Sequence, residues 1–127
     1  MPEPDATITI TGMNEKIKDP RGKEVTILDA EGKEAPADTQ MTLGNVLLML
    51  VTRMKVPEKP RQIILAQRVL ERIAEASDGE GEYTAGSAAL GILREAAKQN
   101  GPGYLIPVMA QVWLAIGTGE PDEPTTP

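Results

Sequence analysis

The sequence predicts an α+β fold: a short N-terminal antiparallel β-meander packed on a cluster of three to four helices. Two observations carry this prediction. Residues 6–34 contain short β-branched runs separated by Asp- and Gly-containing turns. Residues 42–116 instead show apolar residues at helical spacing, interrupted by proline and glycine.

The central feature is a pair of helices whose apolar stretches, residues 43–54 and 63–74, we expect to pack together. In the first, apolar residues recur at i, i+3, i+4 and i+7: Leu43, Val46, Leu47, Leu50, Val51 and Met54. Thr42 is suited to cap this helix, and Gly44 would permit a close backbone approach. Pro60 fits a first helical position, so it begins the second helix.

Before this pair, residues 6–11 alternate Thr and Ile and predict a half-buried strand that Gly12 closes. The segment 19–24, Asp-Pro-Arg-Gly-Lys-Glu, recurs ten residues later as Asp-Ala-Glu-Gly-Lys-Glu at 29–34. Asp followed three residues later by Gly is typical of a type I turn that closes a hairpin. We therefore expect turns at 19–23 and 29–33, with strands at 15–18 and 25–28.

After the pair, Thr84 is expected to cap a third helix at 85–100. The last predicted helix, 104–116, is apolar on nearly every side, and Gly117 ends it. The expected organisation is a disordered leader at 1–5, one domain at 6–117 and a disordered acidic tail at 118–127.

Composition narrows the possible chemistry. The 127 residues include no Cys and no His, which excludes disulfides, Cys/His metal sites, thiol nucleophiles and His-based acid–base catalysis. Residues 78–89 carry acids at the first, third and fifth positions of a calcium loop. However, Tyr83 stands where the sharp turn needs Gly, and Ala89 where a bidentate Glu belongs. We expect no catalytic residue, no metal and no cofactor; a carboxylate- or metal-dependent enzyme is the alternative.

The net charge of −6 disfavours nucleic acid and anionic membranes as partners. Residues 53–72 depart from this balance, with six basic and two acidic residues. The candidate electrostatic contacts are Arg61, Arg68 and Arg72 in this stretch and Glu80 and Glu82 in the acidic loop. There is no signal-peptide pattern and no apolar run of about 18 residues, so we expect a cytoplasmic protein without a membrane span.

The last helix is the candidate partner-binding element. A helix that is apolar all round is either central to the core or covered by a partner. Residues 105, 109, 112 and 116 form one stripe, and 106, 110 and 113 form another, so one could face in and the other out. On the second alternative, another protein or a second copy of the chain would bind through Tyr104, Met109, Trp113 and Ile116, since aromatic and Met side chains favour interfaces.

A resemblance to a known class of proteins rests on two features in order. The lysine-rich Asp-x-x-Gly-Lys turns come first, and the segment Thr42-Leu43-Gly44-Asn45-Val46-Leu47 follows them. With the later Leu65-Ala66-Gln67 helix, this order resembles a class of small proteins of tailed phages and prophages, most of unassigned function, over residues 14–117. The resemblance implies a non-catalytic accessory protein in the host cytoplasm or on the virion. It would act as an assembly factor or chaperone for a virion component; the alternative is an acidic inhibitor of a host nucleic-acid-binding protein.

Overall fold

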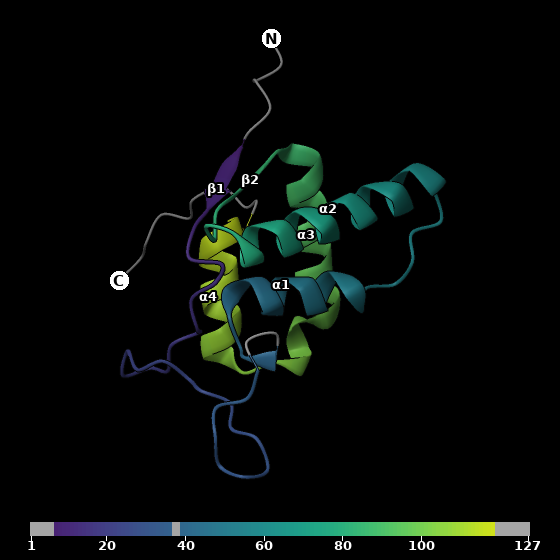
Figure 1. Cartoon of the computed structure of the whole chain (residues 1–127). Helices are drawn as coiled ribbons and strands as arrows, with labels where there is room; N and C mark the ends of the chain where they lie inside the picture. Colours follow the sequence, from purple (N-terminus) through teal and green to yellow (C-terminus); the bar gives the residue numbers. More distant parts are fainter. Residues whose placement is uncertain (1–6, 37–38, 119–127) are drawn as a thin grey trace.

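A computed structural model describes residues 7–36 and 39–118. The predicted leader and, apart from Thr118, the predicted tail lie outside these residues. The elements in chain order are β1 (Ile8–Ile10), α1 (Leu43–Thr52), α2 (Pro60–Asp78), β2 (Tyr83–Ala85), α3 (Ser87–Asn100), a 3-10 turn (Gly101–Gly103) and α4 (Ile106–Ile116). The described residues thus contain four helices and a two-stranded antiparallel sheet, which confirms the α+β class (Figure 1).

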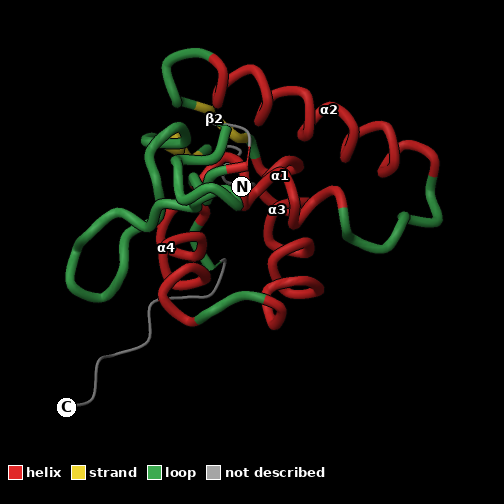
Figure 2. The backbone as a smooth tube through the Cα atoms, turned by 60° about the horizontal axis from the view of Figure 1, so that its bottom comes forward, coloured by secondary structure: helices red, strands yellow, loops and turns green. Residues whose placement is uncertain are grey.

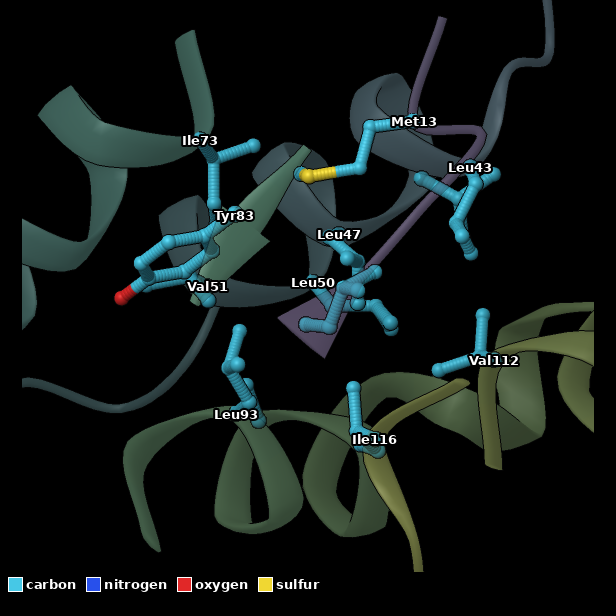
Figure 3. Packing of buried hydrophobic residues seen from close by; sticks show 14 of the residues in the cluster. Met13, Leu43, Leu47, Leu50, Val51, Ile73, Tyr83, Leu93, Val112 and Ile116 are labelled. Atoms are coloured by element: carbon cyan, nitrogen blue, oxygen red, sulfur yellow. The ribbon is translucent and has the colours of Figure 1, made fainter. Parts of the chain in front are cut away.

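Helix α1 lies at the centre and packs against the other three helices. Its apolar face is buried, and Thr42 caps it by accepting a hydrogen bond from the Asn45 amide at 3.1 Å. Figure 3 shows Leu47 and Leu50 between Ile73 on one side and Ile116 on the other. The sequence pattern therefore placed the core correctly on this helix.

The predicted pairing of α1 with α2 is confirmed, but full burial is confined to the C-terminal half of α2, while Leu65 and Ala66 are only partly buried. Val69, Ile73 and Ala76 in its C-terminal half are buried, whereas Ile63 in its N-terminal half is exposed. Figure 1 shows why, because the first turns of α2 extend beyond the rest of the domain. The periodicity continues to the start of the helix, but no neighbouring element covers the stripe there.

The close approach expected at Gly44 is also present. Its amide donates a 2.7 Å hydrogen bond to the Met13 carbonyl, and the Ser77 hydroxyl of α2 lies directly against its Cα. A Cβ at this position would lie 2.8 Å from the Met13 oxygen and would overlap the Ser77 hydroxyl. Glycine therefore sets the distance between α1, α2 and the chain that follows β1.

Strand β1 lies where alternation predicted it, but its partner is β2, with Ile8 opposite Ala85 and Ile10 opposite Tyr83. Thr84 belongs to this second strand, so α3 begins at Ser87 after Gly86, and the cap predicted at Thr84 is wrong. The predicted strands at 15–18 and 25–28 are reduced to isolated bridges.

The two predicted turns are present and form the same hydrogen bonds. In the first, the Asp19 carboxylate accepts hydrogen bonds from the backbone amides of residues 21 and 23. The backbone amide of Asp19 donates to the Lys23 carbonyl at 2.7 Å. Asp29 repeats all three bonds with residues 31 and 33. Both turns project from the domain as loops (Figures 1 and 2).

Candidate protein-binding surfaces

An open groove of about 500 Å³ lies between the α1–α2 connection, the first turns of α2, and α3. Its apolar lining comes from Met54, Val56, Pro57, Leu65, Ala88, Gly91 and Ile92. Val56 stands at the rim with 68% of its surface exposed. On α3, Ala88 and Gly91 lack side chains that would fill the space, and a Cβ added at Gly91 would meet no atom within 4 Å. The small residues of α3 thus leave room for an apolar group from another molecule.

Hydrogen bonds hold one wall of this groove in place. The Lys55 amide donates to the Gln99 side chain at 2.7 Å, and the Gln99 amide in turn donates to Glu95 at 3.1 Å. Next to it, the Asn100 side chain donates to the Leu50 carbonyl at the end of α1 at 2.9 Å. The end of α3 therefore fixes the start of the α1–α2 connection, so this wall exists before any ligand binds.

A second apolar surface lies on α4. Leu105, Ile106 and Leu114 are 75%, 85% and 84% exposed, and Ala110, between the last two, is also exposed. Ile106, Ala110 and Leu114 are four residues apart and share one face of the helix. The opposite face, with Val108, Val112 and Ile116, is buried.

The four residues predicted to bind a partner through α4 lie in different places. Ile116 is fully buried in the core and does not reach the surface of this chain. Tyr104, Met109 and Trp113 are half-buried and pack against the core. The exposed face is formed instead by Ile106, Ala110 and Leu114. It nearly coincides with the second stripe expected from the sequence, residues 106, 110 and 113.

The sequence did not show which face of α4 is exposed. The helix is apolar on nearly every side, so its composition does not distinguish the inner face from the outer one. Polar contacts at its flanks decide the orientation. Arg94 of α3 donates to the carbonyls of Gly117 and Ile116 at 2.9 and 3.2 Å. Gln111 exchanges hydrogen bonds with the amide and carbonyl of Lys18 at 3.1 and 2.8 Å. Within α4 itself, Gln111 breaks the apolar run, so the sequence offered little to distinguish the inner face from the outer one.

The predicted electrostatic residues are all exposed, but they belong to two elements. Arg61, Arg68 and Arg72 lie on α2, whereas Glu80 and Glu82 lie in the loop between α2 and β2. Gly81, between the two acids, is buried, and its carbonyl accepts from the Met13 amide at 2.9 Å. The acidic loop is thus tied to the chain after β1, with its carboxylates outside.

Among the titratable groups of the described residues, Tyr83 has a shifted pKa. Burial raises the pKa of its phenol above the usual 10.0, and the positive charge of Arg72 partly opposes this. Within residues 7–36 and 39–118, no three acidic side chains gather in a group that could hold a metal ion. None of the described helices is both long and apolar enough to cross a membrane.

Comparison with family models, curated proteins and solved structures found no match for this chain.

Proposed function

We propose that this chain is a non-catalytic protein-binding accessory protein, and that its groove receives an apolar segment of another protein. The observation that carries the proposal is the groove beside α3, with its apolar floor and the exposed Val56 at its rim. An apolar side chain left in water at such a rim loses the free energy that burial would provide, about 1.5–3 kcal/mol when fully buried. A protein segment that covers the rim recovers this free energy.

The groove favours a protein segment over a small polar metabolite. Most of its lining is aliphatic, and its charged residues, Lys55, Glu58 and Glu95, carry both signs. It is also open along one side, as expected for a site that holds a chain segment rather than an enclosed ligand. The resemblance to small phage proteins suggests that the partner is a virion component, for which this chain would serve as assembly factor or chaperone.

A photo-crosslinking experiment tests the proposal. A photoreactive phenylalanine analogue replaces Val56 in the full chain, in the cells that encode it, and the same analogue replaces Arg21 in an exposed turn as the control. We expect Val56 to capture one structural protein that Arg21 does not. Capture of the same mixture of proteins at both positions would contradict a specific groove.

A groove-filling variant connects the crosslink to the site. Gly91→Leu places a side chain in the groove without a clash at its Cβ, so it should abolish the Val56 crosslink. Glu71→Leu adds the same side chain to an exposed position of α2 outside the groove and should leave the crosslink intact. An undiminished crosslink in Gly91→Leu would overturn the assignment of the groove.

The acidic inhibitor is the second candidate, and one observation favours it. Glu80 and Glu82 are exposed on either side of a buried glycine, so their carboxylates are held at the surface of an anchored loop. Such a loop suits a basic surface of a nucleic-acid-binding protein. In this case Glu80→Gln/Glu82→Gln would abolish binding, whereas Gly91→Leu would not.

A further inference from the structure

The exposed face of α4 differs from the groove in shape and in chemistry. It is a convex helix surface, and the whole segment from Gly101 to Thr118 contains no Asp, Glu, Lys or Arg. At long range the net charge of −6 would make two copies of the chain repel each other. Because α4 carries no charged side chain, a second copy can approach this face without like-charge repulsion between the two helices.

The order of residues on this face has an approximate two-fold symmetry centred on Ala110. Ile106 and Pro107 precede Ala110 by four and three residues, and Trp113 and Leu114 follow it by three and four. All five lie on one half of the helix. Large apolar side chains therefore stand at both ends of the face, and a methyl group stands at its middle.

We propose that α4 is a self-association surface on which α4 of a second copy packs antiparallel. A two-fold axis through Ala110 makes the same patch contact itself, as in an isologous dimer. Ala110 then faces Ala110 of the second copy, and Ile106 and Pro107 of each copy face Trp113 and Leu114 of the other. The small central residue permits the helices to approach to roughly 8 Å, the short end of the usual range.

Contacts among the described residues keep this face exposed. Val108 and Val112 anchor the opposite side of α4 in the core, and Gln111 and Arg94 bind its flanks. The helix therefore cannot rotate to bury Ile106 and Leu114 within its own chain. Their exposure is fixed by the fold, and the surface is already shaped for the second copy.

The absence of cysteine makes the register directly testable, because any thiol introduced is the only one in the chain. Ala110→Cys places one thiol on the proposed axis, where the Cα–Cα distance of a disulfide, about 4.4–6.8 Å, can be met. Under mild oxidation we expect rapid formation of a disulfide-linked dimer. Ile106→Cys is the matched control, since its own counterpart would lie at the far end of the face, roughly 12 Å away along the helix axis.

Sedimentation equilibrium of the native chain, from about 1 µM to about 1 mM, provides the second measurement. We expect the mass to rise from 13.6 kDa toward twice that value. Ala110→Glu should remain monomeric over the same range, while Ala88→Glu, an exposed alanine in the groove, should dimerise normally.

A native chain that is monomeric at every concentration would overturn the proposal, as would Ile106→Cys forming the disulfide as fast as Ala110→Cys. None of these outcomes depends on what the groove binds, so the self-association surface and the proposed function can fail independently.

Discussion

Gly44 and Gly91 are both helical glycines, but the structure gives them opposite roles. Gly44 lies in a contact too close for any side chain, between the Met13 carbonyl and the Ser77 hydroxyl. Gly91 borders open space in the groove. Glycine destabilises a helix interior by about 1 kcal/mol relative to alanine, and this cost applies to Gly91 inside α3.

The same substitution should therefore shift stability in opposite directions. Gly44→Ala should lower the free energy of unfolding by about 1–3 kcal/mol, because its Cβ must displace Met13 or Ser77. Gly91→Ala should raise it by about 1 kcal/mol, or roughly 4 °C in melting temperature. Thermal and urea unfolding of the two variants measure both effects, and a loss of stability in Gly91→Ala would contradict an empty groove floor.

Tyr83 predicts how stability depends on pH in the alkaline range. Burial raises the pKa of its phenol above 10.0, so the unfolded chain loses this proton at a lower pH than the folded chain. The contribution to stability is complete below pH 10 and is lost as the pH rises through the folded pKa. The ring lies near Val51 in the core, with the hydroxyl directed away from the cluster (Figure 3).

Urea unfolding between pH 8 and pH 11 should accordingly show a decline that Tyr83→Phe reduces. Arg72→Gln should enlarge the decline, because removal of the guanidinium charge raises the pKa further. Identical profiles for the native chain and Tyr83→Phe would show that burial of the phenol does not affect folding.

At the scale of elements, the two Asp-x-x-Gly-Lys turns are alike internally but are attached differently. The buried Gln40 side chain bonds the amide and carbonyl of Ile27 and the carbonyl of Ala35, at 2.7–2.8 Å. It thereby holds the chain on both sides of the second turn. None of these three hydrogen bonds involves the first turn. The Lys16–Glu34 ion pair is exposed and adds little.

Gln40→Ala should therefore loosen the second turn selectively. Hydrogen exchange at the amides of residues 27, 31, 33 and 35 should accelerate about tenfold or more, since each buried group left unpaired costs about 1–3 kcal/mol. Asp19→Ala is the control and should accelerate exchange only at residues 21 and 23. Equal acceleration of both turns in Gln40→Ala would contradict this attachment.

Elements that depend on local patterns could be predicted from sequence, and those that depend on distant partners could not. Thr42, Pro60 and the two turn aspartates act through nearby backbone groups, so their roles follow from spacing. The partner of β1 lies 75 residues away, and each strand has only three residues. The groove was missed because it arises between the α1–α2 connection and α3, although the small residues of α3 were visible in the sequence.

For the whole molecule, α1 is the element around which two separate apolar surfaces are arranged. The groove is lined by the α1–α2 connection, the first turns of α2, and α3. Helix α4 lies on another part of the domain from the α1–α2 connection (Figures 1 and 2). A dimer through α4 would carry two grooves related by a two-fold axis. Such a bivalent protein would bind a partner that presents the recognised segment in several copies more tightly than either groove alone.

The most direct test of protein binding through the groove is the affinity for the protein captured at Val56, measured by titration calorimetry in about 50 mM and about 500 mM salt. We expect a negative heat-capacity change, little dependence on salt, and binding that is at least about tenfold weaker in Gly91→Leu but unchanged in Glu80→Gln/Glu82→Gln. Binding that weakens steeply with salt, is lost in the Glu80→Gln/Glu82→Gln variant and persists in Gly91→Leu would contradict it.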